Sequence, residues 1–515
     1  MNLTSAFSSN SVNCPLQTVK YPSTQHHELK MTRFHRHYGP HLALLGIAVG
    51  LSGCAQLDPA AGMRQVQTTV SERAGQNVLW QRDAHSRAEA ERLSENLLQK
   101  PIGADDAARL ALLNNASLQA SFSELGIAEA NAVQSNLLNN PFLHASVQTP
   151  RGAGRNALDF ALSWDVLGLF TLPLRQDAAA HAKNIARLRA AARALELAAS
   201  ARSAWYGYLT ARESADWLRE MSEASDLIAE IARRLEAAGN QAGLARANAE
   251  TANLDSRYSL ADAQARTEAL HSRLLGLIGL PNLPDRAPGF PDSLPRLPDI
   301  DPAAPGDDEL ENKHLDLARL KAELARAEKL VAGARRGTWT DSLELGWDWS
   351  RESDGAWKDG PGIGIGLPLF DTGMARRAAA GFEVARLQAA LAARRDSLKR
   401  EAKRAESEMK RARSRVEHLR DTLLPLLSAA RDTALLEYNA MHRSAAQLLE
   451  LKQRELAAIR QLVQNLGNYW QARNALEALH LGVSLNSLDT SRATNTDGTG
   501  GIADNFATGT SNAGH

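Results

Sequence analysis

Gly362-Ile-Gly-Ile-Gly-Leu-Pro-Leu-Phe-Asp-Thr-Gly373 is the stretch of this 515-residue sequence that says most about its fold. Its apolar side chains recur at every second position from Ile363 to Leu369, and glycine or proline stands between them. Alternation with period two predicts a β-strand with one apolar face. We therefore expect a strand near residues 361–370.

A long helix is expected to follow this strand. After the turn at Asp371-Thr-Gly373 the sequence becomes rich in Ala, Arg, Leu and Glu, which favour helix, as far as about Tyr438. Pro425 lies inside this stretch and predicts a kink or break, because proline removes a helical hydrogen bond. Residues 439–444 are then expected to form a tip, from which a second helix returns to about Leu481.

The same alternation predicts three further strands, near residues 342–350, 142–149 and 157–167. In two of them the alternating apolar residues are Leu343, Leu345, Trp347 and Trp349, and Leu158, Phe160, Leu162, Trp164 and Val166. Polar turn residues separate the members of each pair, at 150–154 and 351–359. The sequence therefore predicts two β-hairpins, each with one apolar and one polar face.

Helical patterns fill most of the remaining chain, over residues 104–138, 176–238, 244–277 and 307–335. About 60 residues of continuous helix would reach about 90 Å, longer than a compact domain needs. Helix, two strands, helix and helix occur in this order twice, which indicates an internal duplication. We expect one repeat at 103–280, a proline-rich linker at 281–306, a second repeat at 307–482 and a disordered Gly/Thr/Asn/Ser-rich tail at 483–515.

The N-terminal part resembles a bacterial lipoprotein leader. A short apolar run from Leu42 ends in Leu51-Ser-Gly-Cys54, follows basic residues and is too short to span a bilayer comfortably. This pattern is similar to the lipobox, which implies lipidation of Cys54, and Ala55 after it favours sorting to the outer membrane. The alternative is an ordinary signal peptide with an incidental cysteine. Residues 1–53 are therefore the expected leader, with translation starting at Met31 because residues 1–30 do not resemble one.

Residues 54–102 are polar and are expected to form a linker from the lipid to the body, with a helix near 86–99.

The composition excludes several classes of function. With 59 basic and 59 acidic side chains, the chain has no formal net charge, which argues against nucleic acid as a main partner. Only 5% of the residues are aromatic, and the Ala, Leu, Arg and Glu content favours helices packed at coiled-coil spacing. No phosphate-binding loop, Cys/His cluster of metal spacing or nucleophile elbow is present. We therefore predict a protein without catalytic residues, cofactor or metal site.

The strands have the length and pattern of membrane strands. Eight to ten residues of alternating character are enough for a tilted strand to cross the hydrocarbon layer. Five of the nine tryptophans lie within or beside the strands, as an interfacial girdle would require: Trp164, Trp339, Trp347, Trp349 and Trp357. Four strands cannot close a barrel, and an open edge in lipid is very costly, so several copies must pool their strands. The alternative is two soluble hairpins packed on helices.

At these residues the chain resembles the TolC outer-membrane efflux family. The strongest match is the opening stretch, with Pro368, Phe370, Asp371 and Gly373 as the strand-to-helix signature. Looser matches are Leu162-Ser-Trp-Asp-Val-Leu-Gly168, Asn114-Asn-Ala-Ser-Leu118, Leu137-Leu-Asn-Asn-Pro141, Leu235-Glu-Ala-Ala-Gly239 and Tyr438-Asn-Ala-Met-His-Arg-Ser444. The resemblance covers roughly residues 100–482.

The resemblance implies a mainly α-helical protein with a small membrane β-barrel. In the family, a homotrimer forms a barrel of twelve strands, which an α-helical barrel continues across the periplasm. The implied localisation is the outer membrane, lipid-anchored and in contact with lipid, with the body in the periplasm. The implied function is a passive exit duct for small toxic solutes, drugs or metal ions, with a periplasmic adaptor and an inner-membrane RND-type pump as partners.

The resemblance also places a gate at the helix tips. The tip and adaptor-docking positions fall on Gly239, Gly243, Met441, Arg443 and Ser444. Arg443 matches a basic residue that helps to hold the closed state, and Met441 replaces the usual glycine.

The acidic positions of the family's pore constriction fall on Gln447 and Glu450, of which only Glu450 keeps the charge. Ala245 is the position in the first repeat that corresponds to Gln447. The alternative is that Glu450 is a solvated residue on a helix face.

Two other functions remain open. A periplasmic structural or adaptor lipoprotein built from helical hairpins would explain Cys54 and the long helices, but not the alternating strands with their tryptophans. An outer-membrane duct for type I protein secretion would share the same fold.

Overall fold

The chain divides into two units, Met1–Gln56 and Leu57–His515, and all of the residues described below belong to the second. The computed structural model describes residues 59–149, 151–152, 155–240, 242–283, 288–336, 343–367, 369–370 and 372–485. The predicted lipidation site Cys54 and the signature residues Pro368 and Asp371 lie outside these ranges.

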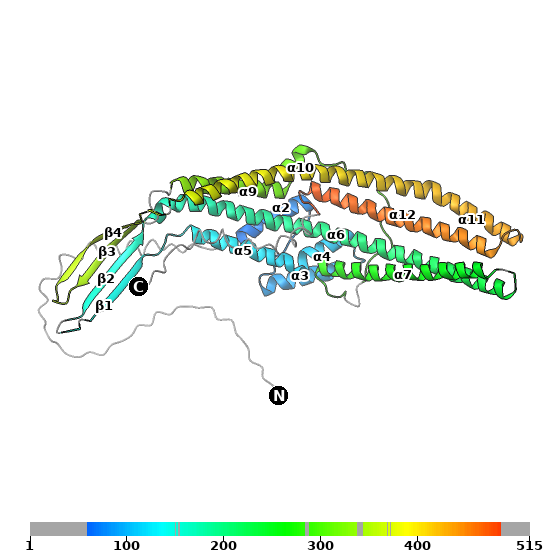
Figure 1. Ribbon diagram of the computed structural model, residues 1–515, viewed down its shortest axis with the longest axis horizontal. Coiled ribbons are helices and arrows are strands. Elements are labelled where there is room, and N and C mark those ends of the chain that lie inside the picture. Colours follow the sequence, from blue (N-terminus) through cyan, green and yellow to red (C-terminus); the bar gives the residue numbers. More distant parts are fainter. Residues whose placement is uncertain are drawn as a thin grey trace, which may run out of the picture. The chain divides into compact units, whose positions relative to one another are not determined.

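The four predicted strands form one antiparallel sheet in the order β1-β2-β3-β4 (Figure 1). Their bounds are Phe142–Gln148 (β1), Ala157–Asp165 (β2), Leu343–Arg351 (β3) and Trp357–Ile365 (β4). Both predicted hairpins are confirmed. The pairing of β2 with β3, in which Phe160 lies opposite Trp349, joins the two repeats into one sheet.

The limits of β4 differ from the prediction of 361–370. Its hairpin loop is tight, because Gly355 donates its amide to Glu352 O (3.0 Å) and Glu352 donates to Ala356 O (3.0 Å). The strand therefore already begins at Trp357, opposite Arg351, and it ends at Ile365. The alternation beyond Ile365 belongs to the connection toward the next helix.

Two predicted helices are interrupted once each, at equivalent places in the two repeats. The stretch 104–138 forms α4 (Ala104–Asn114) and α5 (Ala116–Ser135), and 307–335 forms α8 (Asp307–Lys313) and α9 (Leu315–Arg336). At the first break the Asn115 side chain accepts the Leu118 amide (3.1 Å) and so caps α5. At the second, His314 Nδ1 accepts the Asp316 amide (3.3 Å). A short helix thus precedes a longer one in both halves of the chain.

The remaining helices form two long hairpins. The first consists of α6 (Leu167–Ala237) and α7 (Gly243–Ile278), and the second of α10 (Met374–His418), the π-helical turn η1 (Leu419–Leu423), α11 (Leu424–Asn439) and α12 (Ala445–His480). The predicted break at Pro425 is confirmed, since the π-turn ends there. The 71 residues of α6 extend over about 107 Å at 1.5 Å per residue.

α6 begins nine residues earlier than predicted and includes Pro173. The Val166 amide donates to Leu343 O (2.8 Å), which fixes the end of the strand beside β3, and the helix starts at the next residue. None of the helices in the described ranges is both long and apolar enough to cross a membrane.

The helix expected near residues 86–99 is confirmed as α3 (Ala84–Leu97). The expectation of a linker missed a second helix in the same segment, α2 (Pro59–Ala74). α2 buries Met63, Val66 and Val70 in the main core, and Gly62 contacts the Glu129 carboxylate so closely that a Cβ there would overlap it. Three large apolar residues in sixteen are too weak a pattern to show this packing in advance.

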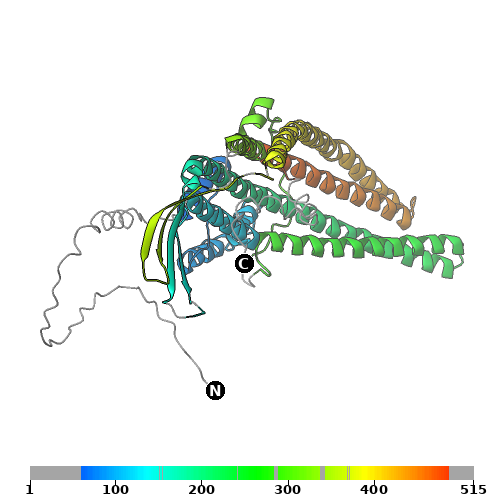
Figure 2. The same ribbon diagram turned by 60° about the vertical axis from the view of Figure 1, so that its left-hand side comes forward.

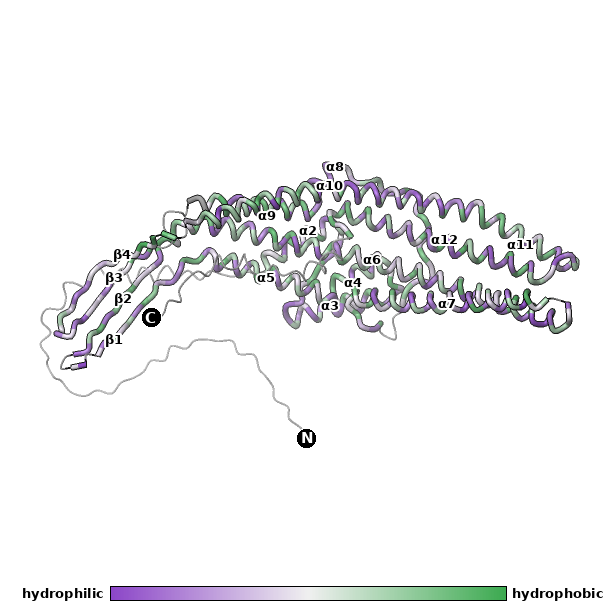
Figure 3. The backbone as a smooth tube through the Cα atoms, in the orientation of Figure 1, coloured by the Kyte–Doolittle hydropathy of each residue, from purple (hydrophilic) through white to green (hydrophobic). Residues whose placement is uncertain are grey.

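The main core lies where α2, α4, α5, α6 and α7 meet, and a second cluster joins α8, α9, α10 and α12. Figure 2 shows the two long helical hairpins, the α6–α7 pair in green and the pair from α10 to α12 in yellow to orange. Figure 3 shows apolar and polar residues interspersed along the helices, as helices with one packed face require.

Hydrogen bonds at the C-terminal end of α12 join it to α2, α8 and α9. Arg73 of α2 donates to Lys313 O (2.6 Å) and Leu481 O (3.0 Å), and the Leu315 amide donates to Gly482 O (2.8 Å). Gly482 has a φ of +86°, and a Cβ on it would overlap Lys313 O and the Arg73 guanidinium. This junction therefore depends on a glycine.

Candidate functional site

The register of the sheet separates apolar from polar side chains. Two neighbouring rows of paired residues run across the four strands. One row consists of Leu143, Leu162, Trp347 and Pro361, and the next consists of His144, Ala161, Asp348 and Gly360. Because successive side chains of a strand point to opposite faces, each row belongs to one face. The apolar face holds Leu143, Val147, Leu158, Phe160, Leu162, Trp164, Leu343, Leu345, Trp347, Trp349, Trp357, Ile363 and Ile365, with Arg351 and Asp359 as its charged members. The polar face holds His144, Ser146, Gln148, Asp159, Ser163, Asp165, Glu344, Asp348, Ser350 and Lys358, with Phe142 at one end.

The apolar face is uncovered in the single chain. Trp357 is 60% exposed and Ile363 69%. The outer strands β1 and β4 each keep one edge without a partner strand in the described part of the chain. An exposed apolar face together with free edges indicates a surface that meets lipid or other copies.

The polar face is acidic and lined by small residues. It carries four carboxylates, Asp159, Asp165, Glu344 and Asp348, against the single lysine Lys358. Glycines of β4 give these acids room, and a Cβ on Gly362 would lie 2.9 Å from Asp348 Oδ2. Such a face favours cations in any solvent-filled space beside it.

The strand-to-helix signature is described at two of its four residues. Gly373 is the N-terminal cap of α10 and has a left-handed conformation, with a φ of +68°. The Phe370 side chain is fully exposed. In the first repeat the corresponding junction is held by Trp164, whose Nε1 donates to Asn139 O (2.8 Å).

The two hairpin tips share one hydrogen-bond pattern. At the end of α6 the Gly239 amide donates to Glu236 O (2.8 Å) and the Asn240 amide to Leu235 O (2.9 Å). At the end of α11 the Met441 amide donates to Tyr438 O (2.9 Å), and the His442 amide to Glu437 O (2.8 Å). This is the Schellman arrangement, which requires a left-handed residue after the helix.

Met441 takes the place that Gly239 holds in the first tip. Its φ is +63°, the only positive φ of a non-glycine residue in the described ranges, and its side chain is 92% exposed. We expect Met441→Gly to stabilise the tip by about 1 kcal/mol, because glycine adopts this conformation without steric cost. Slower amide exchange in residues 436–448 of the variant would verify this, and unchanged or faster exchange would contradict it.

The predicted gate residues lie at the second tip and the start of α12. Arg443 Nε donates to Glu437 Oε2 of the same tip (2.7 Å). Ser444 caps α12, with its amide donating to Gln447 Oε1 (3.2 Å) and its Oγ accepting the Gln447 amide (3.3 Å). Gln447 therefore has a capping role in this chain. Glu450 is exposed on α12, one turn further along.

At the first tip, Gly243 is the first residue of α7, and a Cβ there would lie 3.0 Å from Glu236 Oε1. Glu236 Oε2 also lies 2.9 Å from Arg246 Nε, so that an ion pair closes this tip as well. Within one chain the structure brings Arg443, Ser444 and Gln447 together at their own tip.

A buried ion pair between α11 and α12 was missed by the sequence reasoning. Arg431 Nη1 lies 2.7 Å and 2.8 Å from the two carboxylate oxygens of Glu455, whose side chain is only 9% exposed. The signal in the sequence was the place of Glu455 seven residues after Leu448, on the packed side of the helix. Removing one partner of such a pair leaves a buried charge.

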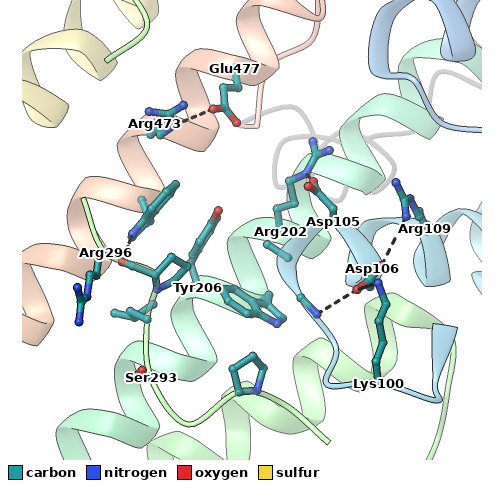
Figure 4. A pocket seen from close by; sticks show the side chains of 17 residues that line it. Lys100, Asp105, Asp106, Arg109, Arg202, Tyr206, Ser293, Arg296, Arg473 and Glu477 are labelled. Carbon is teal, nitrogen blue, oxygen red and sulfur yellow. Dashed lines mark hydrogen bonds and ion pairs between the residues drawn. The ribbon is translucent and has the colours of Figure 1, made fainter. Parts of the chain in front are cut away.

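A cavity of about 840 Å³ lies where α4, α6, α12 and residues 291–296 meet (Figure 4). Its acids are paired: Asp106 lies 3.1 Å from Lys100, Asp105 lies 2.8 Å from Arg202, and Glu477 lies 2.8 Å from Arg473.

Tyr206 stacks on Trp470 at the wall of this cavity, with ring centroids 5.3 Å apart. Burial, and then the negative charges of Glu477 and Asp105, raise the pKa of Tyr206, so that its hydroxyl stays neutral. Paired acids and a neutral phenol do not form a nucleophile with its base. Among the described residues, no three His, Cys, Asp or Glu side chains are grouped closely enough to hold a metal ion.

Comparison with known proteins agrees with these features. No protein-family model matches the chain. It is 24% identical over 392 residues to the cobalt-zinc-cadmium resistance protein CzcC of Cupriavidus metallidurans, covering 74% of this chain and 90% of that protein.

Solved outer-membrane channels share its fold. The open state of the MtrE outer membrane channel of Neisseria gonorrhoeae matches with a TM-score of 0.61 at 18% identity, over 75% of this chain and 90% of that one. The CmeC outer membrane channel of Campylobacter jejuni matches with a TM-score of 0.58 at 16% identity, over 79% and 89%. The resemblance to the TolC-like outer-membrane efflux proteins is thus confirmed, and the chain has their fold.

Proposed function

We propose that this chain is the outer-membrane channel of a tripartite efflux pump, a passive exit duct for small toxic solutes. The observation that supports this best is the sheet: its register gives one apolar and one acidic face, and both of its edges are free in the described part of the chain. In a bilayer the edges must be paired and the apolar face must meet lipid. A homotrimer satisfies both conditions with a closed barrel of twelve strands.

The helices would form the periplasmic part of the duct. α6 alone extends over about 107 Å, and its 71 residues contain one proline near the start. The adaptor would dock on the hairpin tips, which expose Leu244, Leu436 and Met441. Energy for transport would come from the inner-membrane pump.

A lipid on Cys54 fits this placement. In the sequence only four residues separate Cys54 from Pro59, the first residue of α2. α2 is bonded to the helices around it, because Arg187 of α6 donates to Gln65 Oε1 (2.8 Å) and to Glu129 Oε1 of α5 (2.7 Å). The lipid would therefore be joined through α2 to the packed helices.

The acidic face favours cationic cargo, which includes metal ions. Four carboxylates against one lysine per chain become twelve against three in a trimer. Such a lumen attracts cations and repels anions. The metal-resistance relative agrees with metal ions as one substrate class, and organic cations are the other that this charge would accept.

The test is planar-bilayer conductance of the purified, detergent-solubilised protein, with its oligomeric mass measured in parallel. We expect a trimer that forms discrete, cation-selective pores. A monomer without conductance would refute the channel and favour a periplasmic helical-hairpin lipoprotein instead.

Glu450 tests the gate within this function. We expect Glu450→Ala to weaken the block of the pore by divalent cations at least tenfold, because three copies of the change remove a ring of charge at the constriction. Single-channel recording with added cations measures the effect, and Glu220→Ala, an exposed glutamate on α6, is the matched control. Unchanged conductance and cation block in Glu450→Ala would show that this residue is a solvated surface glutamate.

A further inference from the structure

The linker between the repeats crosses the helical body as a bonded strap, defined here as residues 290–301. At its first end the strap is bonded to α6. Arg212 Nη2 donates to Pro291 O (2.8 Å) and to Asp292 Oδ1 (2.9 Å), and the Leu294 amide donates to Glu213 Oε2 (3.2 Å). Figure 4 shows Ser293 and Arg296 of the strap beside Tyr206 of α6.

Further along, the strap reaches α12 and α10. Trp470 Nε1 donates to Pro295 O (2.9 Å), and Arg473 Nη1 donates to Ile300 O (3.2 Å). Leu297 packs against a small core formed by Met409, Ala412, Tyr469 and Ala472. The strap thus holds α6, α12 and α10 at one level.

Asp301 connects α10 and α12 at the end of the strap. Its Oδ1 accepts the Tyr469 hydroxyl (2.6 Å), and its two oxygens lie 2.8 Å and 3.0 Å from the Arg413 guanidinium. Tyr469 is fully buried. Burial, and then the hydrogen bond to Asp301, raise the pKa of Tyr469, so that it keeps the proton it donates.

The second hairpin becomes less rigid just beyond the contacts of Asp301. Six residues after Arg413 the hydrogen-bond ladder of α10 is interrupted by η1, and Pro425 then lacks a donor. Within the chain α11 packs chiefly on α12, and of its residues only Ala434 is buried. α6 by contrast continues without interruption to its tip at Ala237. The second hairpin is therefore well supported by neighbouring elements between the strap and the break, and only weakly supported between the break and its tip.

We propose that Asp301, through Tyr469 and Arg413, is a positioning residue that fixes the pivot about which the α11–α12 hairpin moves. The strap holds α12 against α10 and α6 through its contacts with Tyr469 and Arg473. The break at η1 and Pro425 allows α11 to move independently of α10. Loss of the Asp301 contacts would displace the pivot and increase the amplitude of the motion of the hairpin tip. That this motion acts on a gate rests on the proposed function.

Amide hydrogen exchange of the full-length protein in detergent tests the pivot without relying on transport. In Asp301→Asn we expect exchange in residues 424–462 to accelerate at least tenfold, while residues 215–270 of the α6–α7 hairpin change less than twofold. Asp299→Asn removes a carboxylate from the same strap, where Asp299 is exposed, and should change neither region twofold. Asp301→Glu should restore most of the protection.

Pro425→Ala supplies the opposite change, since it returns a donor to the interrupted ladder and should slow exchange in residues 424–462 at least threefold. Equal acceleration in both hairpins of Asp301→Asn would show a general loss of stability and overturn the pivot, and so would no acceleration. Conductance separates the two proposals. A protein without pores that shows the expected exchange pattern would refute the duct and leave the pivot standing.

Discussion

We expect Phe160→Lys to abolish pore formation, and Ala161→Lys, at the very next residue, to leave the pores intact and lower their cation selectivity. Phe160 lies on the apolar face of β2, opposite Ala145 and Trp349, and Ala161 lies on the acidic face, opposite His144 and Asp348. A lysine on the lipid-facing side of a membrane strand costs up to about 2–4 kcal/mol. Three copies of the change therefore cost up to about 6–12 kcal/mol in a trimeric barrel.

The second variant places the same charge where water is expected. A lysine at 161 stands beside Asp348 and offsets part of the acidic charge of the face without meeting lipid. The measurements are the yield of trimer in the outer-membrane fraction and the reversal potential of single pores in a salt gradient. Normal pores from Phe160→Lys would mean that this face does not meet lipid, and the barrel would then be wrong.

We expect Gly482→Ala to destabilise the helical body by about 3 kcal/mol or more, the larger part of it from steric overlap. Gly482 ends α12 with a φ of +86°, and an added Cβ would overlap the backbone oxygen of Lys313 and the Arg73 guanidinium. Neither neighbour moves easily, because Arg73 also bonds Leu481 O and the Leu315 amide bonds Gly482 O. Separation of α2 from the ends of α8 and α12 is the expected structural result.

Gly239→Ala is the matched control for this change. Gly239 holds the same position after α6, with a φ of +73°, but no atom of the described residues lies within 4 Å of the point that a Cβ would occupy there. Only the conformational cost of about 1 kcal/mol should therefore appear. Urea unfolding followed by helical circular dichroism measures both variants. Equal losses in the two would show that the junction at Gly482 can relax and that the overlap does not matter.

Several features of the fold are encoded locally and were predictable from the sequence. The period-two alternation of β2 and β3 indicates which side chains share a face of the sheet, and this assignment does not depend on the partner strand. The break at Pro425 follows from a missing donor. The tips at Gly239 and Met441 follow from the turn that separates two long helical patterns.

Other features depend on which distant residues meet. The pairing of β2 with β3 joins segments almost two hundred residues apart, and no periodicity specifies that pairing. The ion pair between Arg431 and Glu455 forms only once the helices are packed, and so do the contacts of Asp301 with Tyr469 and Arg413. α2 docks with three buried apolar residues, a pattern that polar linkers share by chance. The pore position of Glu450 stays a prediction, since it depends on further copies of the chain.

The sequence by itself thus determined the four strands, the two faces of each and the long helices, because these depend on the spacing of neighbouring residues. The tertiary structure alone decided the union of the two hairpins into one acidic-faced sheet, the docking of α2 and the path of the strap across α6, α12 and α10. The physical reason is that these contacts arise from side chains that are remote in the chain, and their free energy exists only once the helices and strands lie side by side.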